Sequence, residues 1–81
     1  MVISGDEQYR LLVPGDLGAA LKRARTTEGV SQIAAAEWEG ISQPYLSSLE
    51  SGKFGSSLSH ALRLLRLLNY EVVVRRRPRN G

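Results

Sequence analysis

The sequence contains no cysteine and only one histidine, His60. Without thiols, neither a disulfide framework nor a thiolate metal site can form. No acidic residue lies close to His60 in the sequence, and Glu37 and Glu39 fall on different faces of a predicted helix, so neither suits general acid–base catalysis. A glycine-rich phosphate loop is also missing. The sequence therefore predicts a protein that is not an enzyme and that uses no cofactor and no metal.

Long hydrophobic runs are missing as well. No apolar stretch approaches the roughly 20 residues that a membrane-spanning helix needs. The first residues lack the basic start and the apolar run of a signal peptide. The 81 residues suffice for one domain, and because so short a chain buries a modest share of its surface, oligomerisation is one way to gain stability. We expect a soluble cytoplasmic protein.

Acidic residues are scarce in the last part of the chain. Residues 1–50 carry four Lys or Arg and seven Asp or Glu, a net charge of −3. Residues 51–81 carry seven basic residues and a single acid, Glu71, a net charge of +6. Such a concentration of positive charge suggests an anionic partner for that part of the chain. A solvated tail that keeps the protein soluble is the alternative, and the charge alone favours neither.

The middle of the chain carries the strongest local signals. Two short helices are expected over about 32–39 and 43–51, with Gly40 in the turn between them. Ser31 and Ser42 each precede one of these helices. A serine hydroxyl at that position can accept a hydrogen bond from an otherwise unpaired N–H of the first helical turn.

The second of these helices has two different faces. Leu46 and Leu49 are spaced to point inward together with Tyr45. The opposite face is small, polar and uncharged, which suits close approach to another surface. An amide side chain on such a face can pair with a base edge in the major groove of DNA, so the two helices predict a helix-turn-helix. The side chains of this face are Gln43, Pro44, Ser47 and Ser48.

The order and spacing of residues across these two helices resemble the Xre/Cro, or lambda-repressor-like, helix-turn-helix family. The resemblance covers residues 17–68 and implies a mainly α-helical domain of four to five helices. Ala35 stands where the family usually has leucine, and Glu39 stands where it usually has an apolar or small residue. Trp38 is the candidate to supply the missing volume. The matching residues are Ser31, Gln32, Ala36, Gly40, Ile41, Ser42, Gln43, Leu46, Leu49, Glu50, Gly52 and Lys53.

A further helix is expected before this pair, over about 17–28, with Asp16 as its candidate N-cap. Its Lys22 and Arg25 are expected on a solvated face, with a contact to DNA phosphate as the alternative. Apolar side chains at helical spacing form its core stripe. These side chains are Leu17, Ala20, Leu21 and Ala24.

The last helix is expected over about 59–68. Leu64 and Leu67 extend its apolar surface beyond one stripe, which predicts that a second chain covers part of this helix. Arg63 and Arg66 beside the leucines leave a membrane-surface helix as a weaker alternative. The predicted core stripe consists of Leu58, Ala61, Leu62, Leu65 and Leu68.

The segment 70–75 is the best strand candidate, because it is short and rich in β-branched residues. Its backbone needs a hydrogen-bonding partner, which is either the segment Tyr9–Val13 or the same strand of a second subunit. We favour the second subunit. The residues expected at the dimer interface are Leu64, Leu67, Tyr70, Val72, Val73 and Val74.

The direct passage from the last helix into a strand narrows the resemblance to HipB-type antitoxins, the DNA-binding partners of HipA-like kinase toxins. This resemblance implies C-terminal strands that pair between subunits of a homodimer, and repression of the protein's own operon in the nucleoid. A two-fold dimer implies a double-stranded DNA operator with two half-sites about 34 Å apart or a multiple of it. The alternatives are a stand-alone Xre-family regulator without a toxin and a protein-interaction module that mainly holds a toxin.

We expect the polar face of the second short helix to contact bases. Gln43 would make amide hydrogen bonds, with adenine favoured in the bidentate mode, while Pro44 and Ser48 would make apolar and small polar contacts. Other side chains would fix the register on the phosphates. These are Gln32, which the family resemblance places against a phosphate, and Ser42, Tyr45 and Lys53. The chain then divides into an N-terminal arm over 1–16, a helix-turn-helix domain over 17–68, and a dimerisation strand with a basic tail over 69–81.

Overall fold

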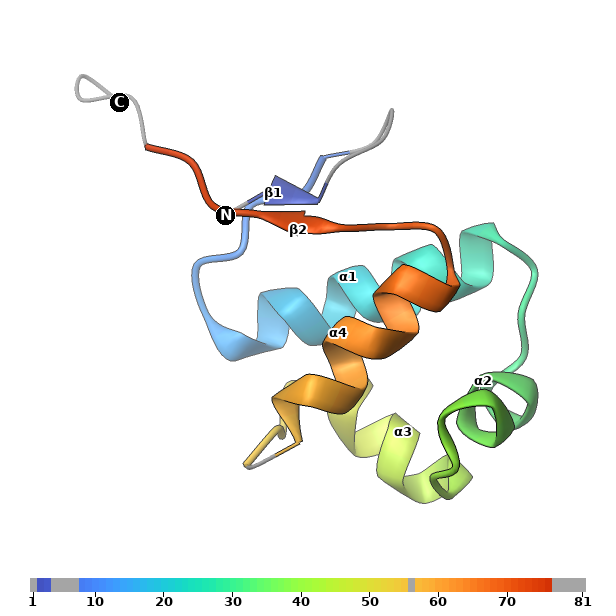
Figure 1. The fold of residues 1–81 in the computed structure, drawn as a ribbon. Helices are drawn as coiled ribbons and strands as arrows, with labels where there is room; N and C mark the ends of the chain where they lie inside the picture. The colour runs from blue at the N-terminus through green and yellow to red at the C-terminus, as the bar shows by residue number, and fades with distance from the viewer. Residues whose placement is uncertain (1, 4–7, 56, 77–81) are drawn as a thin grey trace.

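The computed structural model describes residues 2–3, 8–55 and 57–76, which form four helices and a two-stranded sheet (Figure 1). The mainly α-helical architecture that the sequence predicts is confirmed. The sheet lies at the opposite end of the molecule from α3 (Figure 1). Residues 77–81 of the predicted basic tail lie outside the described residues. The elements in chain order are β1 (Val2–Ile3), α1 (Pro14–Thr27), α2 (Gln32–Glu39), α3 (Gln43–Glu50), α4 (Leu58–Leu67) and β2 (Val72–Val73).

α1 begins at Pro14, inside the predicted N-terminal arm, rather than at Leu17. Proline suits the first helical position because its φ is already helical and its missing N–H needs no partner there. Asp16, predicted as the N-cap, instead lies in the first turn. Its Oδ2 accepts hydrogen bonds from the backbone N–H groups of Leu12 (2.8 Å) and Val13 (3.1 Å). The carboxylate therefore fixes the entry of the chain into α1 without being its cap.

α2 and α3 begin at the residues that the sequence predicts. Ser31 Oγ accepts a hydrogen bond from the backbone N–H of Ala34 (3.1 Å), and Ser42 Oγ accepts one from Tyr45 (3.2 Å). Gly40, with φ of 70°, ends α2 in the left-handed conformation that favours glycine. These local signals set the turn that joins the two helices.

α1 crosses the end of α3 at Gly18. A Cβ atom at this position would lie 2.6 Å from the backbone oxygens of both Leu49 and Glu50. Such a distance is far below van der Waals contact, so only glycine lets the two helices approach this closely. The contact holds the C-terminal end of α3 against the body of the domain.

The core consists of leucine and alanine side chains from all four helices. α2 contributes Ala35 and Ala36, which are 1% and 3% exposed. Trp38 is 50% exposed, so the expectation that it fills the volume missing at Ala35 is wrong. Small side chains instead allow α2 to pack directly against α3 and α4. The largest fully buried side chains are Leu21, Leu46, Leu49, Leu64 and Leu65.

The buried face of α4 differs from the predicted stripe. Leu58 and Leu62 are 45% and 38% exposed, whereas Leu64 is completely buried in the core of its own chain. Leu64 therefore has no surface to offer a second subunit, and its predicted place at a dimer interface is wrong. Two neighbouring faces of this helix both carry leucines at helical spacing, so the spacing alone does not show which of the two faces is buried. The buried set is Ala61, Leu64, Leu65 and Leu68.

β2 pairs antiparallel with β1 of the same chain, with Val2 opposite Val73 and Ile3 opposite Val72. The predicted intramolecular partner, Tyr9–Val13, forms no strand. The backbone of β2 needs hydrogen-bonding partners, and β1 supplies them along one edge. Within the described residues β2 has no neighbour on its other edge, so pairing with a second subunit along that edge stays a prediction.

Candidate nucleic-acid interface

The residues predicted to contact bases share one exposed face of α3. Gln43, Pro44, Ser47 and Ser48 are all exposed. Beneath them, Leu46 and Leu49 are completely buried and anchor the helix in the core. The structure thus brings the small, uncharged polar side chains together on a surface that is open to solvent, while the aliphatic residues of the same helix hold it in place.

A chain of hydrogen bonds connects this face to the interior. Gln43 Nε2 donates to Gln32 Oε1 (3.2 Å), and Gln32 Nε2 donates to Glu50 Oε1 (2.9 Å). One amide hydrogen of Gln43 is used in this way. Its carbonyl oxygen and its other amide hydrogen are then available to a base edge. We call the set Gln43, Gln32, Glu50 and Arg25 the polar network.

The buried end of the polar network is an ion pair between α1 and α3. Arg25 Nε donates to Glu50 Oε2 (2.6 Å), and its second nitrogen, Nη2, lies 3.2 Å from Glu50 Oε1. Both residues are only 8% exposed. The remaining donor Nη1 reaches the backbone oxygen of Val30 (2.8 Å). Ion pairs buried to this degree are tolerated when their hydrogen-bonding groups are satisfied, so the network fixes α1, α2 and α3 relative to one another.

Sequence reasoning missed this ion pair. Arg25 was expected on a solvated face or against a phosphate, and both expectations are wrong because its guanidinium is buried against Glu50. A signal did exist in the sequence. Arg25 follows Leu21 by four residues and Glu50 follows Leu46 by four, so each charge continues a core stripe.

The residues predicted to contact phosphates surround the exposed face of α3. Gln32 and Ser42 stand at the starts of α2 and α3, where unpaired N–H groups and the helix dipole favour an anion. Lys53 is exposed just beyond the end of α3. Tyr45 is 38% exposed and stands on α3 beside the base-facing side chains. Their contacts with DNA remain predictions.

The contacts of Tyr45 and Glu39 were not predicted. The hydroxyl of Tyr45 hydrogen-bonds with Ser57 Oγ, and its ring packs edge-to-face with His60 at a centroid distance of 5.7 Å. Glu39, whose side chain is 5% exposed, lies 2.7 Å from both His60 Nδ1 and Arg63 Nε. These partners explain how an acidic residue occupies a position where the resembled family has an apolar or small one. No short-range pattern reveals them, because the partners lie on different elements.

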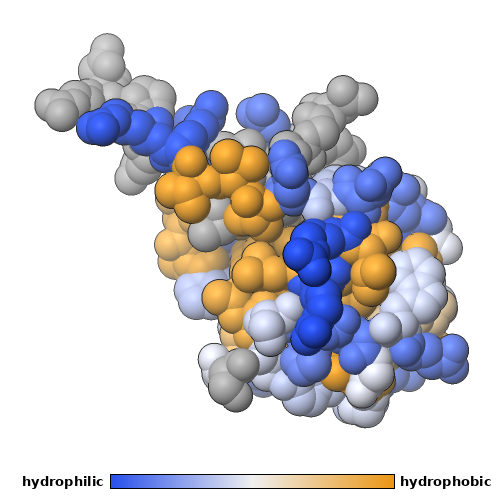
Figure 2. Space-filling view, in the orientation of Figure 1, coloured by the Kyte–Doolittle hydropathy of each residue, from blue (hydrophilic) through white to orange (hydrophobic). Residues whose placement is uncertain are grey.

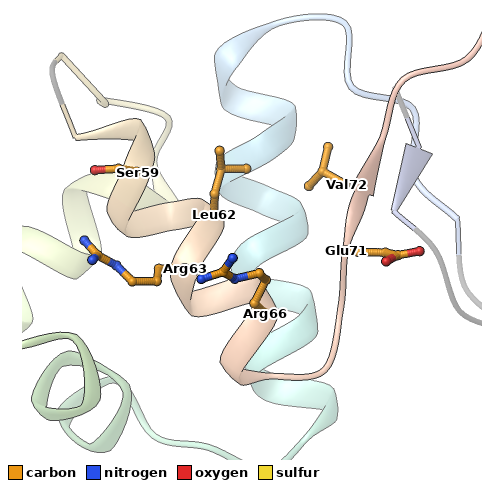
Figure 3. A pocket seen from close by; sticks show the side chains of 6 residues that line it. All are labelled: Ser59, Leu62, Arg63, Arg66, Glu71 and Val72. Atoms are coloured by element: carbon orange, nitrogen blue, oxygen red, sulfur yellow. The ribbon is translucent and has the colours of Figure 1, made fainter.

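The residues predicted for dimerisation gather at the other end of the molecule. Leu67, Val73 and Val74 are 54%, 40% and 82% exposed, while Tyr70 and Val72 pack partly against the core. Figure 2 shows hydrophobic surface gathered around the strands and the neighbouring end of α4. A groove of about 470 Å³ lies between α4 and β2, with Leu62 and Val72 pointing into it (Figure 3). Its other lining residues are Ser59, Arg63, Arg66 and Glu71.

Comparison with known proteins identifies one family. A helix-turn-helix domain family matches residues 16–77, which includes all four helices apart from the first two residues of α1. A search of curated proteins finds no match to this chain. Among the described residues, no helix is long and apolar enough to cross a membrane. The same residues contain no cluster of three or more histidine, cysteine or acidic side chains that could hold a metal ion.

Proposed function

Because the chain belongs to the helix-turn-helix family and is a DNA-binding regulator, we propose that it is a homodimeric, sequence-specific transcriptional repressor. The observation that carries the proposal is the exposed, uncharged face of α3, supported from below by Leu46 and Leu49. Sequence is recognised by hydrogen bonds and apolar contacts to base edges in the major groove. Gln43 is the main base-contacting residue, and Pro44, Ser47 and Ser48 contact neighbouring bases.

The polar network supports this assignment by restricting Gln43. A long amide side chain on a helix surface loses rotamer freedom when it binds a base, and that loss weakens binding. The hydrogen bond from Gln43 to Gln32 holds the amide before DNA arrives. Gln32 is in turn fixed by Glu50. We propose that the fixed orientation of the Gln43 amide favours one base edge over the others, with adenine as the preferred bidentate partner.

Phosphate contacts by Gln32, Ser42, Tyr45 and Lys53 would fix the position of α3 along the duplex. Gln32 hydrogen-bonds with Gln43, and Ser42, Tyr45 and Lys53 lie on α3 or directly next to its ends, so one DNA segment would meet both groups. Only Lys53 among them carries a formal charge. The phosphates are therefore contacted largely through neutral donors and helix starts, and we expect a shallow dependence of affinity on salt for one protomer.

The homodimer is proposed from the open edge of β2. Residues 71–75 read Glu-Val-Val-Val-Arg, which is self-complementary about Val73. Antiparallel pairing with a second copy around a two-fold axis at Val73 sets Glu71 opposite Arg75 of the partner subunit, and opposite charges facing each other stabilise paired strands. Exposed Leu67 and Val74, and the groove between α4 and β2, supply apolar surface for the same contact.

A dimer of this kind would occupy two half-sites about 34 Å apart or a multiple of it. Binding there would block RNA polymerase, which is the proposed mechanism of repression. The resemblance to HipB-type antitoxins supports a finer proposal: a cytoplasmic, nucleoid-associated antitoxin that represses its own operon and binds a HipA-like kinase toxin. The exposed apolar surface at the β2 end favours a protein partner there.

Two alternatives fit the same features. A stand-alone regulator of the Xre family would use the same α3 face without a toxin. A module that mainly holds a toxin would use the β2 end, and the α3 face would then contribute little to its function. A kinase-like gene beside this one, and recovery of its product in complex with this protein, would favour the antitoxin over the stand-alone regulator.

The proposal is tested by selecting bound sequences from a pool of random duplexes. We expect an enriched half-site that occurs twice with two-fold symmetry and a fixed spacing. A reporter driven by the promoter of the protein's own operon then measures repression with and without the protein. Enrichment of no sequence would contradict base recognition, and an unchanged reporter would contradict autoregulation.

A further inference from the structure

The open edge of β2 borders the groove between α4 and β2. β1 pairs with one edge of β2, and Figure 1 shows β1 on the side of β2 that faces away from α4. The other edge of β2, which has no neighbouring strand among the described residues, is therefore the one nearer to α4. A strand added along this edge would lie beside the groove.

Side chains along β2 alternate between the two faces of the sheet. Val72 points into the groove, on the side of Leu62, whereas the carboxylate of Glu71 points away from it (Figure 3). Val74 follows Val72 by two residues, so in an extended strand it lies on the same face. Val72 packs partly against the core, but Val74 is 82% exposed, more than any other large hydrophobic side chain that the structure describes. Its own chain gives Val74 almost no apolar cover.

The proposed pairing of two β2 strands supplies this cover. In the register centred on Val73, Val72 of one protomer lies opposite Val74 of the partner subunit. Side chains directly opposite each other in an antiparallel pair share one face of the sheet, with Cβ atoms about 4.5–5.5 Å apart. Val74 of the partner subunit then lies on the groove side of the sheet, next to Val72. The two-fold axis repeats this arrangement at the second groove.

We propose that the groove between α4 and β2 is the binding site for Val74 of the partner subunit, which packs against Leu62 and Val72. This inference rests on the proposed function, in which the protein is a homodimer paired through β2. Each protomer then completes the groove of the other, and Leu62, which is 38% exposed in the single chain, becomes covered. Covering apolar side chains in this way stabilises the dimer.

The charged residues beside the groove are compatible with a second copy of the chain. Arg63, one of the lining residues, already pairs with Glu39 at 2.7 Å. Arg66 is exposed, and a long arginine side chain can cover apolar surface with its stem while its charge stays in water. In the proposed register, Glu71 faces Arg75 of the partner subunit on the opposite face of the sheet. The contact inside the groove is therefore left to aliphatic side chains.

The test uses two complementary variants, L62K and V74E. Both positions are exposed in the single chain, so neither substitution alters the core, and circular dichroism checks that both variants keep the fold. Sedimentation analysis then measures the dimer dissociation constant of each. We expect each variant alone to dimerise at least about tenfold more weakly than the wild type, because a charge faces an apolar side chain at both grooves.

The decisive measurement is made on an equimolar mixture of L62K and V74E. In a mixed dimer, the introduced lysine faces the introduced glutamate at one groove, and the native Leu62 and Val74 meet at the other. We expect the mixture to dimerise at least about tenfold more tightly than either variant alone. Such recovery cannot arise within a single chain. A mixture of L62K with V74K should show no recovery, because two positive charges then meet.

The matched control is I33E, which introduces the same charge on α2 at a residue that is 59% exposed, and it should leave the dimer unchanged. A wild-type dimer, together with a mixture that associates as weakly as its components, would overturn the inference and leave the homodimer intact. L62K and V74E proteins that dimerise as tightly as the wild type would also overturn it, and would leave the groove to another partner. A wild-type protein that stays monomeric at every concentration would overturn both the inference and the proposed homodimer.

Discussion

The two ends of the molecule expose opposite kinds of surface. At the α3 end, the side chains predicted to contact bases are uncharged and exposed, and Gln32 connects one of them, Gln43, to the buried ion pair of Arg25 and Glu50. At the β2 end, the exposed side chains include Leu62, Leu67 and Val74, and a groove opens between α4 and β2. Polar groups in a fixed array can discriminate between hydrogen-bonding partners, whereas an apolar surface gains free energy from being covered. We therefore propose that DNA binds at the α3 end and a protein partner at the β2 end.

This division has a consequence for stability. The stability of the α3 end depends on the buried pair of Arg25 and Glu50. The β2 end has apolar contacts to which a partner would add. Perturbing one end should therefore leave the other largely unchanged, because the polar network and β2 share no residue.

The largest effect is expected from E50A. This substitution leaves Arg25 buried without its carboxylate, and breaking a buried ion pair in this way typically costs about 3–5 kcal/mol of unfolding free energy. Urea unfolding followed by circular dichroism measures the loss. The double variant R25M/E50L, which removes both charges, should recover most of it. Equal stability of the single and double variants would contradict the assigned role of the ion pair.

A smaller effect is expected from G18A, which tests the crossing of α1 and α3. The added Cβ would meet the backbone oxygens of Leu49 and Glu50 at 2.6 Å, so the helices must separate, at about 1–3 kcal/mol. Gly15 is the matched control on the same helix, because a Cβ there meets nothing within 4 Å. G15A should be neutral or slightly stabilising. Thermal unfolding that shows the same shift for both variants would refute the close approach.

Local features of the helices could be predicted from the sequence, whereas contacts between distant residues could not. The starts of α2 and α3 could be predicted, because Ser31 and Ser42 cap their helices through neighbours three residues away. The exposed face of α3 could also be predicted, since helical spacing alone sets Ser48 on the side opposite Leu46. The core stripes of α1 and α3 indicate that Arg25 and Glu50 are buried, but not that they pair with each other, because the two residues are 25 positions apart. Local patterns do not encode which distant charges meet.

The β2 end was predicted less well. Leucines occupy positions 58, 62, 64, 65, 67 and 68, so the sequence allowed two choices of buried face on α4. Packing against α1 and α2 decided between them. β1 spans two residues, Val2–Ile3, which is too short to show a period. Its pairing with β2 was consequently missed, and Tyr9–Val13 was considered in its place.

The smallest effect is expected from reversing a charge at the β2 end. E71R sets two arginines opposite each other in the proposed dimer, and each such pair should weaken association by up to about 1 kcal/mol. The swapped variant E71R/R75E should restore it. E28R changes the net charge equally at the exposed end of α1 and serves as the control. Sedimentation analysis that finds the same dimer dissociation constant for E71R and the swapped variant would exclude this register.

The central claim is that the exposed face of α3 recognises DNA sequence, and Q43A tests it most directly. Fluorescence anisotropy gives the dissociation constants of wild-type and Q43A proteins on the selected duplex and on a scrambled one, with K53A as the control for a phosphate contact. We predict that Q43A loses about 1–3 kcal/mol on the selected duplex and little on the scrambled one, whereas K53A loses similar amounts on both. Equal losses of Q43A on the two duplexes would contradict the claim.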